Sequence, residues 1–595
     1  MEKTHVVIVG AGPVGLFTAY LLARQKIKCI VLERRHGVSE HPKAHTINPR
    51  TLEIFRQAGL DVAYIRKYAA GARDAGSVRL VYGLADAEIG SFPYERQDDE
   101  VRSLTPEPLV NWPQPELERL LQKSVIETGL VHIRRGWQVD SVNMMTETTG
   151  VETGCVCVVS CSSSSNSSNS NTSSTRLRRD ADGDTTRHKC IQADFVIGAD
   201  GVNSTVREKM GGIEFQSMGP GYAYQSVIYR GSLRSALPAD REAMLYFCFH
   251  PDHPSQFIAH RLDTSFVHVT PVMDTVPLPS AGAQQRKAAA ARSSPEACLP
   301  GLRYTEVLRT IWETAPRVAS SYSDAKHGRV FLVGDAAHSL PPQGGLGLNT
   351  GIADAHNLVW KLVSIMQNKG NSSHLLSSYT RERRPVALAN LEYSKASEAA
   401  FYSVSTTLVG VAVQYQEARA EVPGLAMDAF LQQPVVCAGV AGAVAEASQH
   451  FDSLALQLGF IYDDDPSSTR PLLDNPTRYV PRACPGARLP HGMISGENDD
   501  GHRDGRLLSL LDLVPYDRFT VLHHANPVFA SCDWAIDVAG LGMPEAWHDA
   551  VPEIKKGKGI VVRPDLHVLL HVDNPRQAED AVAEYLDRGE VRRIR

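Results

Sequence analysis

The chain has 595 residues, a formal net charge of −6, and 43% hydrophobic and 22% charged residues. This length predicts about three or four domains, and the composition is that of an ordinary soluble globular protein. A small negative net charge gives no electrostatic basis for binding nucleic acid or an anionic membrane. No apolar run approaches the roughly 18 residues that a membrane-spanning helix needs, so we expect neither nucleic acid nor membrane as a partner.

The N-terminus and the cysteines predict a cytoplasmic protein. A strand-like run that begins at His5 leaves no room for a signal peptide. Of ten cysteines, only Cys155, Cys157 and Cys161 cluster, and this spacing without a second cluster is a poor zinc pattern. The alternation in residues 154–160 predicts a strand instead. We therefore expect free cysteines in a reducing compartment and no metal site.

Residues 5–33 carry the strand–turn–helix–strand pattern that dinucleotide binding requires. The three glycines would allow a tight turn, close approach of the backbone to a pyrophosphate, and packing of the helix on the strand. The phosphates would face free N–H groups at the positive end of the helix. Glu33 ends the second strand, where a carboxylate accepts hydrogen bonds from a ribose and leaves little room for a 2′-phosphate. The unit alone does not separate FAD from NAD. Its predicted cofactor contacts are Gly10, Gly12, Pro13, Val14, Gly15, Glu33 and Arg34.

The middle of the chain alternates between sheet-like and flexible segments. Residues 162–175 are a Ser/Asn-rich tract that charged residues extend, so residues 162–188 are predicted to be a disordered insertion. Apolar alternation predicts strands of a mostly antiparallel sheet, and patterns of helical period predict two long helices. The strands are 223–229, 244–250 and 266–272, and the helices are 349–366 and 375 to about 405.

Three further motifs select the cofactor. Residues 193–207 and 328–338 contain apolar strands that end in Asp200 and Asp335, and Asp335 could accept from a ribityl hydroxyl. Residues 341–349 follow, and their glycines would let the backbone pass against a flat ring. The N–H groups that open the next helix would stabilise negative charge at N1 and C2=O of a reduced flavin. With residues 5–33, these motifs predict bound FAD. The contacts predicted here are Asp200, Asp335, Gly345, Gly347, Leu348 and Asn349.

These motifs resemble those of the single-component FAD-dependent aromatic hydroxylases, the group A flavoprotein monooxygenases. Nearly the whole chain resembles their phenol hydroxylase branch, which includes chlorophenol monooxygenases and polyketide hydroxylases. Residues 43–53 are similar to the branch's segment beside the flavin, with Lys43 where Arg is usual. Residues 112–118 are similar to a segment whose glutamine, here Gln114, contacts FAD. Two further segments, 485–491 and 562–565, resemble the branch's C-terminal thioredoxin-like domain, here without a CxxC motif.

The resemblance implies a monooxygenase that uses NADPH or NADH and O₂ to hydroxylate a phenolic or polyketide-derived aromatic substrate through C4a-hydroperoxyflavin. A base near the substrate hydroxyl would favour the reactive phenolate. His45 stands where phenol hydroxylases place an Asp, and Tyr224 lies on a predicted strand of the sheet that should cover the active site. The candidate catalytic residues are His45, Tyr224 and Pro342, which lies in the glycine-rich segment of residues 341–349. His45 could equally pack or bond the backbone near the flavin, and Tyr224 could equally be a core residue.

The motifs leave the reaction and the nicotinamide cofactor open. Baeyer–Villiger oxidation and epoxidation are possible on the same fold and differ from hydroxylation in their products. A flavin oxidase or dehydrogenase would give a product without oxygen from O₂. A flavoprotein that serves only as a binding scaffold would show no NADPH oxidation stimulated by phenols.

We expect an α/β fold with a Rossmann-like FAD-binding domain, a sheet-based substrate domain and a thioredoxin-like domain. The resemblance gives the last of these a role in dimerisation, so a homodimer is an expectation. The FAD-binding domain would comprise residues 1–75, 105–212 and 325–400, and the substrate domain residues 76–104 and 213–324. A helical connection, 401–469, would lead to the thioredoxin-like domain, 470–595.

Overall fold

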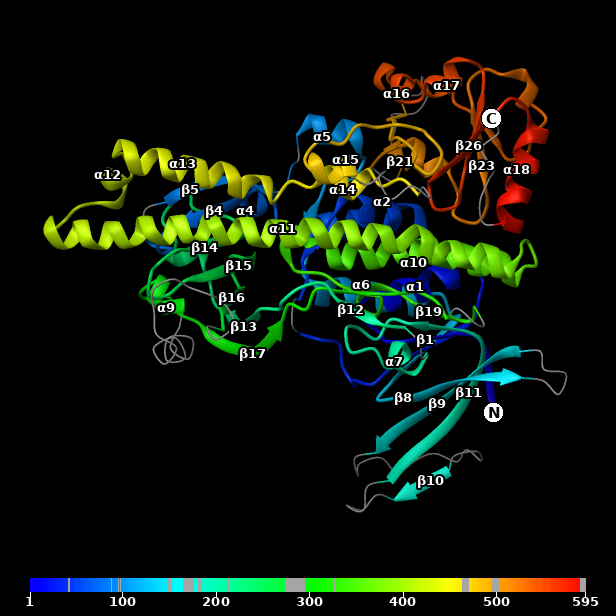
Figure 1. Cartoon of the computed structure of the whole chain (residues 1–595), viewed down its shortest axis with the longest axis horizontal. Coiled ribbons are helices and arrows are strands. Elements are labelled where there is room, and N and C mark those ends of the chain that lie inside the picture. The colour runs from blue at the N-terminus through cyan, green and yellow to red at the C-terminus, as the bar shows by residue number, and fades with distance from the viewer. Residues whose placement is uncertain are drawn as a thin grey trace.

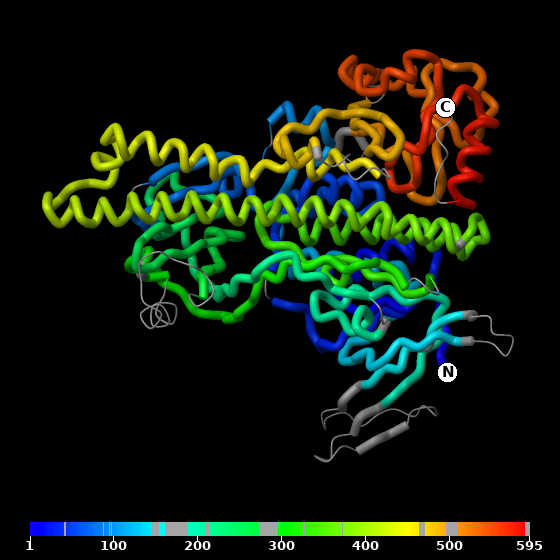
Figure 2. The backbone as a smooth tube through the Cα atoms, in the orientation of Figure 1, coloured from blue at the N-terminus to red at the C-terminus, as the bar shows by residue number. Residues whose placement is uncertain are grey.

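In the computed structural model, helix α11 (Ser372–Glu421) runs the length of the molecule (Figure 1). The sheet that contains the N-terminal strand lies on one side of this helix, and the sheet formed by the C-terminal part of the chain lies on the other (Figures 1 and 2). The structure describes residues 1–40, 43–86, 88–94, 96, 98–146, 152–163, 176–179, 185–210, 213–272, 295–324, 328–462, 470–494, 502–503 and 506–588.

The first sheet has a parallel centre built from apolar strands that lie far apart in the sequence. Strand β1 pairs in parallel with β2 and β11, and β11 pairs in parallel with β19. The second half of β1, residues 6–9, is buried, as expected for a parallel strand with helices over the sheet. Helix α1 (Pro13–Arg24) follows β1 and packs against α6 (Gln114–Glu127) and α10 (Leu346–Met366). Across the sheet the strands are β7 (Val131–Arg135), β2 (Cys29–Glu33), β1 (Glu2–Val9), β11 (Thr185–Gly198), β9 (Glu152–Ser163) and β8 (Gln138–Thr146), with β10 (Arg176–Arg179) and β19 (Val330–Leu332) paired to β11.

The structure corrects the prediction that all of residues 162–188 form a disordered insertion. Strand β9 continues to Ser163, β10 occupies part of the predicted insertion, and β11 begins at Thr185. Antiparallel pairing of β11 with β9 and β10 satisfies these backbone groups, so polar segments form strands without an apolar core of their own. The rest of the predicted insertion, residues 164–175 and 180–184, lies outside the described residues.

The second sheet has seven strands and joins residues 77–93 to residues 223–313. Its two faces have different neighbours. Val227 and Tyr229 of β13 belong to one core cluster, together with Phe257. Because side chains alternate along a strand, Tyr224 and Ser226 lie on the opposite face. Across the sheet the strands are β17 (Thr305–Glu313), β13 (Ala223–Arg230), β16 (Ser265–Pro271), β15 (Ser255–Arg261), β14 (Leu245–Cys248), β4 (Ser77–Val81) and β5 (Glu88–Pro93).

Helix α11 connects the two sheets, and it is longer than the sequence predicted. It continues to Glu421, so the predicted boundary between residues 400 and 401 falls inside one unbroken helix. Its distal half and α13 (Pro434–Gln449) pack on the second sheet, where Val404 and Leu408 join the same apolar cluster as Val78. An 18-residue window of α11 has a mean hydropathy of 1.2, so by length and composition alone this helix could cross a membrane. One such helix is weak evidence, because core helices of soluble proteins meet the same criterion.

The C-terminal part forms a four-stranded sheet. Strand β23 pairs in parallel with β24 and antiparallel with β25, and β26 pairs antiparallel with β25. Buried ion pairs attach this part to the rest of the chain: Arg488 binds Glu53 of α2 (Pro49–Ala58), and Arg563 binds Glu382 of α11 at 2.8 Å. Its elements include β23 (Thr520–His523), β24 (Ala535–Asp537), α16 (Glu545–Ala550), α17 (Pro552–Lys555), β25 (Gly559–Val562), β26 (Val568–Val572) and α18 (Pro575–Arg588).

The remaining elements are short and connect these parts. Their bounds are β3 (Thr46–Ile47), α3 (Val62–Tyr68), α4 (Ala72–Ala75), α5 (Asp99–Leu104), β6 (Val110–Asn111), α7 (Thr205–Met210), β12 (Phe215–Ser217), α9 (Pro295–Cys298), β18 (Arg317–Ala319), β20 (His338–Ser339), α12 (Met427–Leu431), α14 (Leu454–Leu458), α15 (Arg470–Asp474), β21 (His502–Arg503) and β22 (Arg506–Leu507). Strands β12, β18 and β20 form a small sheet, and β3 pairs with β6.

Candidate active site

The turn between β1 and α1 is one that only glycine can form at two positions. Gly10 has φ of +105°, and a Cβ there would lie 2.3 Å from the Ala199 carbonyl oxygen. A Cβ on Gly15 would lie 2.1 Å from the Gly10 carbonyl oxygen. A Cβ on Gly12, by contrast, would meet nothing within 4 Å, so this part of the turn borders open space where a pyrophosphate fits.

Glu33 is hydrogen-bonded to this turn, and the N–H groups that donate to its carboxylate keep it ionised. Its carboxylate accepts hydrogen bonds from the backbone N–H groups of Ala11 and Arg35, each at 2.9 Å. Burial alone would raise the pKa of Glu33, but these N–H donors outweigh burial and lower it. An ionised carboxylate with lone pairs to spare suits the ribose hydroxyls of an adenosine. Arg34, which was also predicted to contact the cofactor, is exposed.

The motif that ends in Gly334 and Asp335 lies against the N-terminal glycine turn at Val14. Gly334, at the end of β19, has φ of +60°, and a Cβ there would lie 3.1 Å from Val14. The next residue, Asp335, has an accessible side chain, but burial by the surrounding walls raises its pKa, with His338 and Lys43 opposing the shift.

The loop before α10 is held in an unusual backbone conformation. Gly344 and Gly345 have φ of +83° and +62°, and a Cβ on Gly345 would lie 2.9 Å from Thr46. Asn349 fastens this loop to the Thr46 segment. Its Nδ2 donates to the carbonyls of Gly345 at 2.6 Å and Thr46 at 3.0 Å, and its Oδ1 accepts from the Asn48 N–H at 3.0 Å. Asn349 thus acts as a clamp on the loop, while Gly347, where a Cβ would meet nothing within 4 Å, borders open space.

The segments around Lys43 and Gln114 lie side by side. The Trp112 N–H donates to the His45 carbonyl at 2.7 Å, and the Gln114 N–H donates to the Ala44 carbonyl at 2.8 Å. The Gln114 side chain donates to Glu118 at 2.7 Å. The two segments predicted to flank the flavin therefore form one edge of the same site.

His45 lies in a partly buried polar cluster. Its Nε2 is 3.3 Å from the Tyr94 hydroxyl, which is 2.9 Å from the Thr46 hydroxyl. The His260 ring packs edge-on against the His45 ring, with centroids 5.1 Å apart. Burial lowers the pKa of His45 to about 4, so its imidazole is neutral at physiological pH. Sequence analysis missed Tyr94 and His260, because both reach His45 only through the fold of the second sheet.

Tyr224 lies on the inner face of that sheet, the face that carries Ser226 and turns toward α11. Its ring stacks on Trp312 of β17, with centroids 4.9 Å apart and an interplanar angle of 25°. The Trp312 indole N–H donates to the Ser226 hydroxyl at 2.7 Å. Nearby, Phe247 of β14 packs against Phe401 of α11 with centroids 4.6 Å apart. The inner face thus carries the stacked Tyr224–Trp312 pair and Phe247, whose rings suit the packing of an aromatic substrate.

Two predicted site residues have identifiable local roles. Asp200 accepts from the Ser204 hydroxyl at 2.5 Å and the Val206 N–H at 3.2 Å, which caps α7 beside Gly10. Pro13 occupies the first turn of α1, where a missing N–H is tolerated. Pro342 is exposed at the start of the glycine loop.

Within the described residues, no group of three or more His, Cys, Asp or Glu side chains could hold a metal ion.

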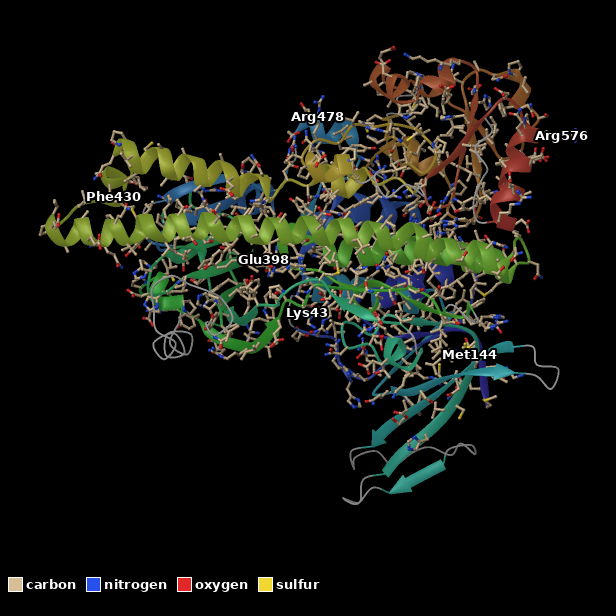
Figure 3. The ribbon with its side chains drawn as sticks, in the orientation of Figure 1. Lys43, Met144, Glu398, Phe430, Arg478 and Arg576 are labelled. Carbon is tan, nitrogen blue, oxygen red and sulfur yellow. The ribbon has the colours of Figure 1, made fainter. Side chains whose placement is uncertain are left out.

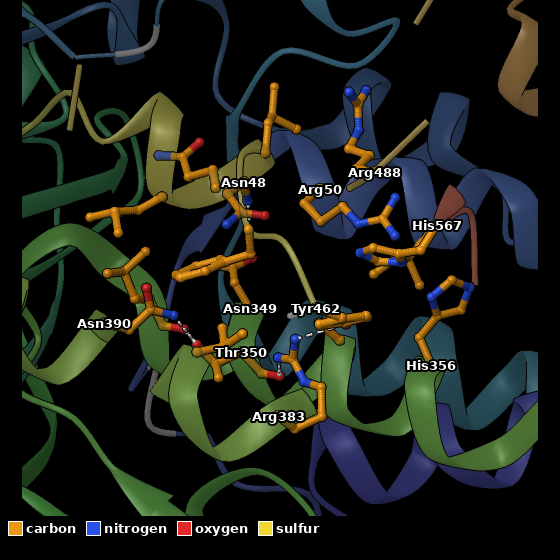
Figure 4. A pocket seen from close by; sticks show the side chains of 18 residues that line it. Asn48, Arg50, Asn349, Thr350, His356, Arg383, Asn390, Tyr462, Arg488 and His567 are labelled. Carbon is orange, nitrogen blue, oxygen red and sulfur yellow. Dashed lines mark hydrogen bonds between the residues drawn. The ribbon is translucent and has the colours of Figure 1, made fainter. Parts of the chain in front are cut away.

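A small cavity of about 40 Å³ lies behind the start of α10, between α2, α11 and the C-terminal part (Figure 4). Arg383 crosses it, donating to the Thr350 carbonyl at 3.2 Å and the Tyr462 hydroxyl at 3.1 Å. Arg50 and Arg488 also line it. This volume is enough for a few water molecules but not for an aromatic substrate, so the cavity belongs to the support of α10.

Comparison with known proteins agrees with this geometry. Residues 3–394, about two thirds of the chain, match the FAD binding domain family. An FAD-dependent monooxygenase of Emericella nidulans, apdD, is 27% identical over 97% of this chain and 88% of its own length. The aklavinone 12-hydroxylase RdmE of Streptomyces purpurascens is 29% identical over 100% of this chain and 99% of its own length.

A solved structure gives the same result. The flavin-dependent monooxygenase PieE, determined in complex with FAD and substrate, superposes with a TM-score of 0.75 at 25% identity and covers 98% of this chain and 99% of its own. The glycine turn, Glu33 and the loop before α10 are the segments that the sequence predicted to contact FAD. The chain therefore belongs to the FAD binding domain family and is an FAD-dependent monooxygenase of its aromatic polyketide hydroxylase branch.

Proposed function

We propose that this monooxygenase hydroxylates a polycyclic phenolic substrate of polyketide type, bound between the inner face of the second sheet and the loop of residues 343–345. Three observations support the proposal: the glycine loop in left-handed backbone conformation, the polar cluster at His45, which Thr46 joins to this loop, and the aromatic pair Tyr224–Trp312. The relatives named above include an enzyme that acts on aklavinone, which supports a multi-ring aromatic substrate.

Bound FAD, once reduced by NADPH or NADH, would supply the activation of O₂. The residues of this chain would bind and orient the substrate and exclude water. Gly12, Gly15, Glu33 and Asp335 would hold the cofactor, and the N–H groups at the start of α10 would face its ring system. A site with aromatic walls excludes water from the reacting oxygen, which suppresses loss of the oxidant as H₂O₂.

We assign His45 and Tyr94 to the substrate hydroxyl. A neutral imidazole beside a tyrosine hydroxyl can accept or donate a hydrogen bond without bringing a charge into a buried site. This makes His45 an orienting residue. A conjugate-acid pKa of about 4 makes it a poor proton acceptor at neutral pH. Tyr224 and Trp312 would contact the ring system of the substrate by stacking.

The test is product analysis with the purified holoenzyme. Heat-released cofactor should be FAD and not FMN, and a panel of hydroxyanthraquinones and naphthols should stimulate NADPH or NADH oxidation. With ¹⁸O₂, the product should carry one ¹⁸O as a ring hydroxyl. A lactone, ester or epoxide would assign the enzyme to Baeyer–Villiger oxidation or epoxidation, and a product without ¹⁸O would assign it to the oxidases or dehydrogenases.

We propose that the C-terminal part is a thioredoxin-like domain without redox activity, and that it mediates a homodimer. The sheet order β24–β23–β25–β26, with one parallel and two antiparallel pairs, supports this proposal. The absence of a CxxC motif from residues 470–595 argues against thiol–disulfide exchange there. Light scattering coupled to size-exclusion chromatography should give the mass of two chains, and the mass of one chain would contradict the dimer.

A further inference from the structure

Glu398 lies on α11 (Figure 3), four residues after Ser394, which contacts the flavin loop of residues 343–345. The helix is fixed against the loop one turn earlier, where the Ser394 hydroxyl donates to the Gln343 carbonyl at 3.0 Å. Beside it, Tyr393 packs so closely on Gly344 that a Cβ there would lie 2.9 Å from the tyrosine ring. These two contacts fix the part of α11 that carries Glu398 against the loop.

The carboxyl group of Glu398 is half-buried and incompletely paired. Its Oε1 atom is buried and has no hydrogen-bond partner within the described part of the chain. Gln343 Oε1, on the flavin loop, is likewise a buried acceptor without a partner among the described residues. Native proteins satisfy buried polar atoms, so two such acceptors at one junction point to hydrogen-bond donors on a ligand.

Three residues further along α11, Phe401 packs against Phe247 of β14 with ring centroids 4.6 Å apart, so this part of the helix lies against the second sheet. Glu398 therefore lies between Ser394, which contacts the loop, and Phe401, which contacts the sheet. Burial raises the pKa of Tyr224, and the negative charge of Glu398 raises it further, in agreement with this placement.

We propose that Glu398 accepts a hydrogen bond from a phenolic hydroxyl of the substrate and removes its proton. This rests on the proposed function, which it deepens by naming the base. The phenol O–H bond breaks, the proton passes to a Glu398 oxygen, and the electron pair stays on the phenolate oxygen, which makes the ring more nucleophilic. The proton then leaves to solvent through the accessible side of the carboxyl group. The ligand class is a polycyclic aromatic with a hydroxyl at the end of the site next to α11.

The local charges suit this role better at Glu398 than at His45. Burial raises the pKa of Glu398 to about 7, and Lys395 on the same helix opposes the shift. Lys395 is also engaged elsewhere, because its ammonium group donates to the Met218 carbonyl. The other titratable groups around the site are Tyr224 on β13 and Tyr393 on α11; burial raises the pKa of both, that of Tyr393 to about 12, and both stay neutral. A base is most effective when its pKa lies near the working pH, which Glu398 meets and His45 does not.

The test compares Glu398→Gln and Glu398→Asp with Glu417→Gln, which changes an exposed glutamate on the same helix. The probe is 1,8-dihydroxyanthraquinone, added to holoenzyme between pH 5.5 and 8.5. Its affinity is followed by difference absorbance with oxidised enzyme, and its turnover by product formation. FAD content and the NADPH oxidation rate without probe are measured for each variant, to exclude misfolding.

In the wild type and in Glu417→Gln, probe affinity and kcat should rise with pH through about 7, as Glu398 loses its proton. Glu398→Gln should lose this pH dependence, bind the probe about 10- to 100-fold more weakly at pH 8, and lose about 10²- to 10⁴-fold in kcat. Glu398→Asp should restore the pH dependence with a smaller kcat.

A Glu398→Gln enzyme that keeps the wild-type pH dependence and kcat would overturn the inference and leave the proposed function intact. A wild type that binds the probe with the expected pH dependence but forms no hydroxylated product would contradict the proposed function, while the role of Glu398 in binding would stand. A wild type that neither binds nor hydroxylates any phenol of the panel would overturn both.

Discussion

Asn349 offers a sharp test of how the flavin loop is organised. Its side chain is 4% exposed and makes three hydrogen bonds that join the start of α10 to the segment of residues 46–48. In Asn349→Ala the Asn48 N–H and the carbonyls of Thr46 and Gly345 lose these partners, each inside the fold. A buried polar group left unpaired costs about 1–3 kcal/mol, so the two fully buried groups, the Asn48 N–H and the Thr46 carbonyl, together cost about 2–6 kcal/mol.

Much of this cost should appear in cofactor binding, because Gly344 and Gly345 need the clamp to stay in their left-handed backbone conformation. Without it, FAD binding must supply the free energy that orders the loop. If about 2 kcal/mol falls on binding, the FAD dissociation constant rises about 30-fold. The assay is titration of the apoprotein with FAD, followed by quenching of flavin fluorescence, with thermal unfolding of apo and holo forms measured in parallel.

The control is Gln367→Ala, which changes an exposed side chain at the other end of α10 and should leave FAD affinity unchanged. Wild-type FAD affinity together with wild-type unfolding temperatures in Asn349→Ala would refute the reasoning, because it would mean that the loop keeps its conformation without the clamp. A fall in stability of the apoprotein with unchanged FAD affinity would show that the clamp acts on the fold and not on the cofactor site.

Three further changes test other parts of the structure. In Asp335→Ala we expect FAD occupancy to fall while the fold persists, because the ribityl chain loses an acceptor; unchanged FAD affinity would mean that Asp335 does not contact the cofactor. In His45→Ala, hydroxylation should become partly uncoupled to H₂O₂ while flavin reduction stays near normal, and wild-type coupling would remove His45 from the mechanism. In Glu53→Ala, loss of the partner of buried Arg488 should lower stability by about 3–5 kcal/mol, seen as earlier urea unfolding and proteolytic release of the C-terminal part, whereas exposed Glu579→Ala should change neither.

Sequence reasoning was most successful where a local pattern carries its own geometric requirement. The glycines of residues 10–15 must form a tight turn between a buried strand and a helix, and the structure places β1, the turn and α1 there. The long helices at residues 349–366 and 375–405 were predicted from apolar periodicity. Helix α10 ends at the predicted residue, Met366, but the predicted end of α11 was wrong. Helix α11 extends to Glu421 because its distal half finds an apolar face of the second sheet and α13 to pack on, and no local signal announces that contact.

Residues 162–188 show where composition alone gave the wrong structure. Composition predicted disorder for all of residues 162–188, yet strands β9, β10 and β11 extend into this stretch. Pairing with a neighbouring strand satisfies the backbone whatever the side chains are, and low-complexity composition contains no information about such a partner.

What the sequence determined by itself was the cofactor, because the phosphate-binding turn, Glu33 and the glycine loop are contiguous motifs whose chemistry depends on short-range spacing. The class of reaction came from the resemblance of these motifs to those of the aromatic hydroxylases. What only the tertiary structure decided was the substrate side of the site. His45, Tyr94 and His260 lie in separate segments that meet through the second sheet, and Glu398 comes near both the loop and that sheet only because α11 contacts both. Those contacts span up to about two hundred residues of sequence, and their chemistry depends on burial, which no local pattern encodes.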